Sequence, residues 1–281
     1  MNTHIVPSSN PNTPGQPFEV YAIRYAYHDG RRAADNYIGP VDFHDADSNL
    51  DYFVWLIRND TETWLVDTGF GQEAATQRGR TLLMRPSQGL ALLNVDAASI
   101  RNVIITHMHY DHAGTLDDFP AATFHVQCAE SAYATGRCMC HPTLRHPYYV
   151  EDIVTFVRKL YNDRIVFHQG QANLAPGLSL HLVGGHTDGL QVVRVWTQRG
   201  WVVLASDATH LYGNIDKGIP FPAVYNIGDM LEGHSIARNL ADSPAHIVPG
   251  HDPLVMHRYP APSPALRGKI VRLDVAPNQH K

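Results

Sequence analysis

The most constraining feature of this chain is a cluster of histidine and aspartate residues that directly follows a short apolar segment. The segment Val103-Ile104-Ile105 has the length and composition of a buried strand, and His107, His109, Asp111 and His112 come next. In extended backbone, residues two positions apart point the same way, so His107 and His109 can converge on one metal ion. After the chain turns, Asp111 and His112 are close enough to face a second ion. Imidazole and carboxylate groups suit zinc and similar metals, so this spacing predicts a metal site at the end of a strand.

Three further candidate ligands share one structural context. His186, Asp207 and His251 each lie just past an apolar, strand-like run, where a loop leaves the edge of a sheet. Loops at one edge of a rigid sheet can converge on a common point. Glycines beside His186 and His251 allow the backbone to approach a metal closely. We therefore expect these three residues to join the cluster at 107–112.

The pattern of apolar residues predicts strands in two groups, each followed by helices. The predicted strands are 18–27, 52–57, 63–66, 123–127, 178–183, 192–196, 201–205 and 245–248. The predicted helices are 71–101 with a break near Pro86, 129–135, 151–160 and 227–241. Such an order predicts a sandwich of sheets covered by helices. Residues 1–17 are rich in proline, serine and asparagine and predict a flexible N-terminal arm. Residues 18–281 are expected to form a single domain, with an aromatic and His/Pro-rich insertion over the site at about 136–170.

Composition excludes several classes of partner. The formal net charge of −5 gives no basic footprint, which argues against nucleic acid. No segment approaches the 18 or more apolar residues of a membrane span, and no secretory signal is visible. Three cysteines cannot all pair, so the chain is not a disulfide scaffold. We therefore expect a cytoplasmic protein with no nucleic-acid or membrane partner.

The complete set of candidate ligands, in its order along the chain, resembles the metallo-β-lactamase superfamily. The matching features are a His-x-His-x-Asp-His motif, a Gly-His, an aspartate after a strand and a final Gly-His, and the turn at 67–69 also looks like the family's early signature. The resemblance implies an α+β four-layer αββα sandwich with two metal ions at one sheet edge. It also implies one ligand set for each ion and one residue shared between them. The first set is His107, His109 and His186, the second is Asp111, His112 and His251, and Asp207 bridges both.

The implied centre would supply hydrolytic chemistry. Two divalent ions sharing a carboxylate leave room for a water molecule that they acidify, and the resulting bridging hydroxide would attack a carbonyl carbon. Asp111 would orient this water or pass a proton to the leaving group. Zinc is the expected metal, although iron, manganese and cobalt suit the same ligands.

Within the superfamily, the chain is most similar to the quorum-quenching N-acyl homoserine lactonases. The shared features are the form of the motif at 107–114, the Ser-Asp-Ala segment at 206–208 and the Gly-His-Asp-Pro segment at 250–253. The resemblance implies a hydrolase that opens a lactone, a small-molecule cyclic ester. It also allows a homodimer, because dimers are common among such lactonases.

The sequence departs from those lactonases at three places. They usually carry a tyrosine three residues after the bridging aspartate, whereas this chain has His210 there and its nearest tyrosine is Tyr212. The hydroxyl of that tyrosine can stabilise a carbonyl oxyanion, and the imidazole of His210 could donate the same hydrogen bond. The aromatic segment at 137–149 and the lack of prolines around His186 also differ.

These departures leave the substrate open. Another ester, an amide, a thioester or a phosphodiester is the alternative to a lactone. A basic pocket would favour a phosphodiester, but near the insertion the sequence offers only Arg137 and Arg145. A non-catalytic sensor or scaffold is the third hypothesis, and the presence of all seven ligands argues against it.

Overall fold

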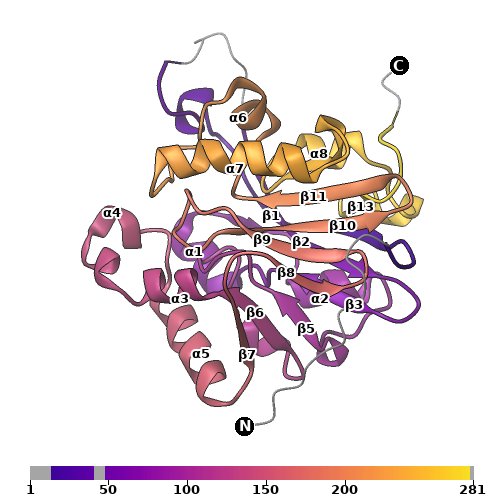
Figure 1. Ribbon diagram of the computed structural model, residues 1–281, viewed down its shortest axis with the longest axis horizontal. Coiled ribbons are helices and arrows are strands. Elements are labelled where there is room, and N and C mark those ends of the chain that lie inside the picture. Colours follow the sequence, from indigo (N-terminus) through magenta and orange to yellow (C-terminus); the bar gives the residue numbers. More distant parts are fainter. Residues whose placement is uncertain (1–13, 41–47, 279–281) are drawn as a thin grey trace.

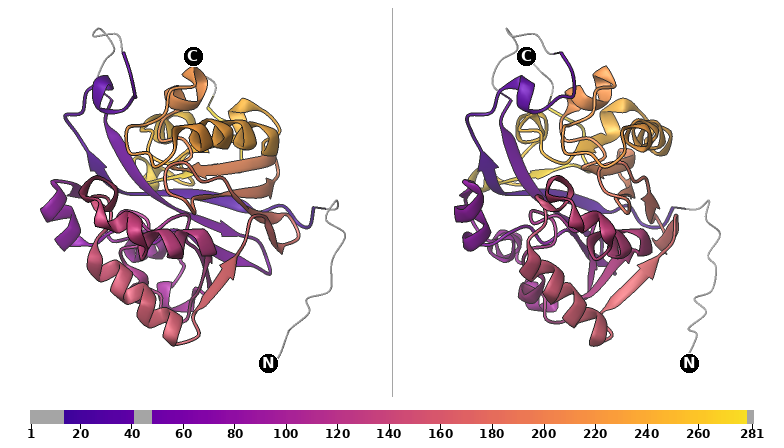
Figure 2. Two further views of the ribbon diagram at one scale, coloured as in Figure 1. Left: turned by 60° about the vertical axis from the view of Figure 1, so that its left-hand side comes forward. Right: turned by 90° about the vertical axis from the view of Figure 1, so that its left-hand side faces the viewer.

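The structure is a computed structural model that describes residues 14–40 and 48–278. Most of the predicted flexible arm, residues 1–13, therefore lies outside the described residues. Two β-sheets pack face to face, and helices cover the outer face of each sheet (Figure 1). Figure 2 shows from two further directions that the sheets lie between the two helical layers.

Within the described residues, the first sheet has eight strands in the order β13-β1-β2-β3-β5-β6-β7, with β4 paired to β1. Their bounds are β1 Glu19–His28, β2 Leu50–Arg58, β3 Thr63–Val66, β4 Thr81–Leu82, β5 Asn102–Ile104, β6 Thr123–Gln127, β7 Ile165–His168 and β13 Ile270–Arg272. The strands from β13 to β3 pair antiparallel, whereas β3, β5, β6 and β7 pair parallel. The parallel part places the end of β5 at one edge of the sheet, where the candidate ligands begin.

In the described part of the chain, the second sheet has five strands in the order β12-β11-β10-β9-β8. Their bounds are β8 Ala172–Ala175, β9 Leu178–Leu182, β10 Gln191–Thr197, β11 Gly200–Ser206 and β12 Ile247–Pro249. Strands β11 and β12 pair parallel, so both end at the same edge.

Alternation along the strands builds two of the core layers. In β1, Val20 and Ala22 belong to the buried cluster between the sheets, and Ile23 and Tyr25 belong to the cluster beneath the helices. Such alternation is expected because successive side chains of a strand point to opposite faces. A third buried cluster joins the outer face of the second sheet to its helices.

Eight helices complete the described part of the fold. They are α1 Gln72–Arg78, α2 Pro86–Ala91, α3 Cys128–Ala134, α4 Pro142–Arg145, α5 Val150–Tyr161, α6 Tyr212–Lys217, α7 Ile227–Leu240 and α8 Leu254–Arg258. Helices α1, α2, α3 and α5 pack on the first sheet, and α6 and α7 pack on the second. This arrangement confirms the predicted αββα sandwich. No helix in the described ranges combines the length and apolar character that crossing a membrane requires.

Two segments differ from the elements expected of them. The predicted helix 71–101 is two short helices separated by β4, because Gly79 ends α1 in a left-handed conformation (φ 62°) and Pro86 begins α2. The segment 136–170 folds as short helical turns and α5, but it ends in β7, which is a strand of the first sheet.

Candidate metal centre

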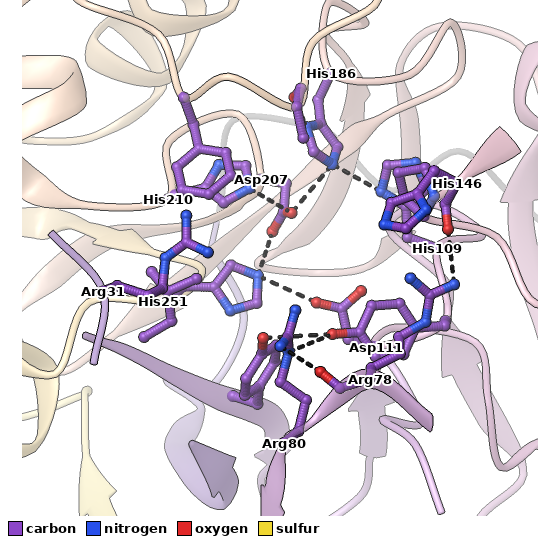
Figure 3. Close-up of a pocket in the computed structure, with 16 residues that line it drawn as sticks. Arg31, Arg78, Arg80, His109, Asp111, His146, His186, Asp207, His210 and His251 are labelled. Atoms are coloured by element: carbon purple, nitrogen blue, oxygen red, sulfur yellow. Dashed lines mark hydrogen bonds and ion pairs between the residues drawn. The ribbon is translucent and has the colours of Figure 1, made fainter. Parts of the chain in front are cut away.

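All seven candidate ligands come from loops that follow strands at one edge of the sandwich. The loop after β5 carries the cluster at 107–112, the loop after β9 carries His186, and Asp207 and His251 come directly after β11 and β12. Each of the seven is buried. Figure 3 shows His186, Asp207, His251 and Asp111 directed toward one another in a pocket.

One group of side chains is arranged to hold a first metal ion. The potential ligand atoms of His107, His109, His186 and Asp207 all lie within 4.8 Å of one another. His186 Nε2 lies 2.9 Å from His109 Nδ1 and 3.1 Å from Asp207 Oδ2. His107 Nε2 lies 3.8 Å from the same carboxylate oxygen. Three imidazole nitrogens and one carboxylate oxygen thus face a common point, as a tetrahedral zinc site requires.

A second group lies on the other side of Asp207. It consists of Asp111, His112 and His251, whose potential ligand atoms also lie within 4.8 Å of one another. Both imidazole Nε2 atoms lie 3.7 Å from Asp111 Oδ2. Asp207 Oδ1 lies 3.3 Å from His112 Nε2 and 3.0 Å from His251 Nε2. The two oxygens of Asp207 therefore face different groups, which is the geometry of a bridging carboxylate.

The residues present fit divalent metal ions. His107 Nε2, His112 Nε2 and Asp207 Oδ1 are buried without a hydrogen-bond partner. Buried polar atoms rarely lack a partner, and a metal ion would supply one to each of these three. Burial also lowers the pKa of His107 and of His109 well below the usual value, so both imidazoles are neutral, which is the form that binds metal.

Asp67 fixes the orientation of the metal-binding loop. Its carboxylate accepts hydrogen bonds from the backbone N–H of Thr106 (2.7 Å) and from the Thr106 hydroxyl (2.8 Å). Its Oδ2 also lies 2.7 Å from His112 Nδ1. A carboxylate at Nδ1 orients the ring and leaves Nε2 available to a metal. The structure thus gives a physical reason for the early Asp-Thr-Gly signature.

A second buried carboxylate, Glu130 of α3, joins three segments around the site. It accepts hydrogen bonds from the backbone N–H of Met108 (2.7 Å), the Thr187 hydroxyl (2.6 Å) and the Tyr148 hydroxyl (3.1 Å). These partners lie beside His107, beside His186 and in the segment at 136–170. Glu130 therefore ties together the loops that carry the first ligand group. Sequence reasoning missed it, because a single glutamate in the first turn of a helix usually faces water.

His210 reaches the pocket. Its Nε2 lies 3.0 Å from Asp207 Oδ2, and its ring stacks on Phe221 with a centroid distance of 3.7 Å. Burial lowers the pKa of His210 to about 3, so the imidazole is neutral and has a single N–H.

Tyr212 does not join the site, which corrects the sequence-based expectation. As the first residue of α6, it is buried in the cluster between the sheets, and the Arg258 guanidinium lies 3.8 Å from its ring centroid. It is absent from the described residues that line the pocket. We therefore assign it no catalytic role.

The pocket over the metal centre is more basic than the sequence suggested. Arginines 31, 78 and 80 line it, and the expected Arg137 and Arg145 do not. Its apolar part comes from Leu50, Phe221 and Ala223. His146 and Pro147 of the segment 136–170 also line the pocket.

Comparisons with known proteins agree with this geometry. The family model of the metallo-beta-lactamase superfamily matches residues 49–263, a range that includes every candidate ligand. A probable metallo-hydrolase of Mycobacterium tuberculosis is 28% identical over 223 residues, covering 70% of this chain and 69% of that protein. An N-acyl homoserine lactonase of Bacillus thuringiensis is 26% identical over 188 residues, covering 62% of this chain and 70% of that protein.

Solved structures share the fold. A quorum-quenching N-acyl homoserine lactone lactonase superposes with a TM-score of 0.69 at 22% identity, covering 85% of this chain and 94% of that one. A hydrolase of the β-lactamase superfamily gives the same TM-score at 15% identity, covering 95% of this chain and 96% of that one. Because the family model matches most of the chain, this protein belongs to the metallo-β-lactamase superfamily.

Proposed function

We propose that this protein opens lactones with two bound divalent metal ions, for which zinc is the expected identity. Family membership and the His/Asp cluster make the chain a metal-dependent hydrolase. The observation that carries the proposal of a two-metal site is the placement of Asp207 between two ligand groups in one pocket. The relatives named N-acyl homoserine lactonases support a cyclic ester as the substrate.

The residues of the pocket would divide the chemistry between them. Bound metal ions would lower the pKa of a water molecule and polarise the substrate carbonyl. Asp111 belongs to the second ligand group and also lines the pocket, where its carboxylate can orient that water and carry a proton to the departing alkoxide. Leu50 and Phe221 would contact the apolar part of the substrate and exclude water.

The direct test is a panel of lactones assayed with and without a chelator. We expect the metal-loaded protein to open at least one lactone, chelation to abolish turnover, and added zinc to restore it. Metal content measured on the same samples would show whether two ions accompany full activity. If the metal-loaded protein opens no lactone but cleaves an amide, thioester or phosphodiester, the lactonase proposal is wrong and the alternative holds.

His210 is proposed to take the place of the oxyanion-stabilising tyrosine. Its Nε2 lies 3.0 Å from Asp207 Oδ2, and both residues line the pocket. We expect His210→Phe to lower kcat for a lactone about 100-fold, the usual cost of losing one oxyanion donor. The phenyl ring would preserve the stacking on Phe221. We expect His210→Tyr, which restores a hydroxyl donor, to retain most of the activity.

Steady-state kinetics of the two variants, with bound metal measured in each, would separate this role from a packing role. Equal losses in the phenylalanine and tyrosine variants would contradict it. Loss of a metal ion from His210→Phe would instead identify His210 as a ligand, since its side chain also lies within 4.8 Å of Asp207 and His251 ligand atoms.

A further inference from the structure

Three arginines from two separate segments of the chain line the same pocket as the metal centre. Arg31 follows β1, Arg78 ends α1, and Arg80 precedes β4. Figure 3 shows Arg31 beside His210 and His251, with Arg78 and Arg80 on the side of Asp111. The only carboxylates lining this pocket within the described ranges are Asp111 and Asp207, which are candidate metal ligands. Bound metal ions would neutralise these two carboxylates, so the wall of the pocket would carry a net positive charge.

Within the described residues, the hydrogen-bond partners of these guanidinium groups are neutral. Arg78 donates to the backbone carbonyls of His146 (2.7 Å) and Tyr148 (3.0 Å). Arg80 donates through Nε to the Tyr110 hydroxyl (3.1 Å), and Arg31 donates through Nε to the side-chain oxygen of Asn36 (2.7 Å). Each guanidinium has five N–H donors, so these contacts hold the groups in place without using all of their donors.

Arginines elsewhere in the protein show a different pattern. Four of them form ion pairs of 3.0 Å or less with a carboxylate, namely Arg24 with Asp51, Arg58 with Glu19, Arg85 with Asp118 and Arg272 with Asp274. No such pair forms at the three pocket arginines among residues 14–40 and 48–278. Among the described carboxylates, Asp35 acts on Arg31, Asp152 acts on Arg78 and Asp111 acts on Arg80 through longer-range electrostatics.

Part-buried charges without a counterion are unfavourable, and they are retained where a ligand supplies the opposite charge. We propose that the substrate carries a carboxylate, separate from its scissile ester, that Arg80 and Arg31 bind. This inference rests on the proposed function, because it names the substrate class of that same site: a lactone or ester with an acidic substituent. The planar guanidinium suits a carboxylate through two parallel hydrogen bonds, and Leu50 and Phe221 would contact the carbon chain between the two groups.

A matched pair of esters tests this proposal on the metal-loaded protein. Mono(p-nitrophenyl) glutarate and p-nitrophenyl valerate have acyl chains of equal length, but only the first carries a carboxylate. We expect kcat/KM to be about 10-fold or more higher for the glutarate ester, the effect of one well-placed charged hydrogen bond. In Arg80→Met and Arg31→Met this preference should fall below about 3-fold through a higher KM. Arg101→Met, which removes an exposed arginine outside the pocket, is the control and should keep the preference.

The ratio of kcat/KM for the two esters does not change when a variant is partly unfolded, because partial unfolding would lower both rates equally. An equal or faster rate with the valerate ester in the wild-type protein would overturn the proposal, and so would a preference that survives both pocket variants. A phosphate could use the same arginines. The p-nitrophenyl ester of 4-phosphonobutyrate presents the same scissile ester to the metal centre and a phosphonate in place of the distal carboxylate. We therefore expect kcat/KM to be higher for the glutarate ester than for this phosphonate ester, and the reverse order would overturn the assignment to a carboxylate.

Failure of the proposed function is distinguishable from failure of this inference. If neither ester is cleaved, ester hydrolysis is contradicted, but calorimetry of glutarate against valerate still reports on the arginines. Both ligands offer one carboxylate to the metal ions, so their difference measures the second carboxylate alone. Glutarate binding about 10-fold more tightly than valerate, with the difference lost in Arg80→Met, supports the inference. Equal binding overturns it.

Discussion

Asp207→Asn is expected to remove at least one metal ion and to lower kcat/KM for a lactone about 1,000-fold or more, which corresponds to about 4 kcal/mol of transition-state stabilisation. Asp207 is the residue whose two oxygens face both ligand groups, at 3.1 Å from His186 Nε2 and 3.0 Å from His251 Nε2. In the proposed two-metal site, an amide in its place would remove the negative charge shared by the ions and one of the two oxygen ligands. Metal analysis and steady-state kinetics on the same samples would measure both effects.

The control for this variant is Asp274→Asn. Asp274 is also buried, but it pairs with Arg272 away from the pocket, so its loss affects stability and not the metal centre. We expect this control to retain metal and kcat/KM while lowering the melting temperature. If Asp207→Asn retained two ions and full kcat/KM, a bridging role for Asp207 would be contradicted.

The structure brings the predicted candidate ligands together because each of them follows a short apolar strand. In extended backbone, side-chain direction repeats every two residues, which places His107 and His109 on one side of the chain. Parallel pairing of β11 with β12 brings Asp207 and His251 to one edge of the sheet. The first of these rules is local, whereas the pairing of β11 with β12 is a long-range contact. The grouping of strands and helices predicted a sandwich of sheets covered by helices, and the resemblance to the superfamily implied its αββα layers.

Tyr212 shows where this local reasoning fails. It lies only two residues after His210, but α6 begins at Tyr212, and the change to helical backbone directs its side chain into the layer between the sheets. Distance along the chain predicts direction within a strand or a helix. It does not predict direction across the start of a helix.

Glu130 and the pocket arginines were missed for a different reason. Glu130 contacts loops that lie 22 and 57 residues away along the chain. Arg31 reaches the pocket from the connection between β1 and β2, and Arg80 reaches it from the residue before β4. Their positions depend on how the loops pack against one another, and no spacing in the sequence records this packing. The basic character of the pocket, and with it the inferred substrate class, could therefore be recognised only from the structure.

Substitution of Asp111 is expected to have the second large effect on activity. Comparing two substrates for this variant separates a proton-transfer role of Asp111 from a metal-ligand role. We expect Asp111→Asn, saturated with metal, to lower kcat for a lactone about 100- to 10,000-fold, because an amide cannot carry a proton to the departing alkoxide. The loop should stay in place, since the Tyr25 hydroxyl donates to the backbone carbonyl of Asp111 (2.8 Å) and not to its carboxylate. A p-nitrophenyl ester has a leaving group that departs without a proton, so its turnover should fall much less.

The comparison of the two substrates decides between the roles. Asp111 Oδ2 lies 3.7 Å from both His112 Nε2 and His251 Nε2, so its carboxylate borders the second metal position as well as the pocket. If Asp111 acted only as a ligand, the variant would lose the second ion, and both substrates would slow by the same factor because both need the same metal centre. Equal losses would therefore contradict proton transfer by Asp111. A loss confined to the lactone, with two ions still bound, would identify the carboxylate that completes the opening of the ring.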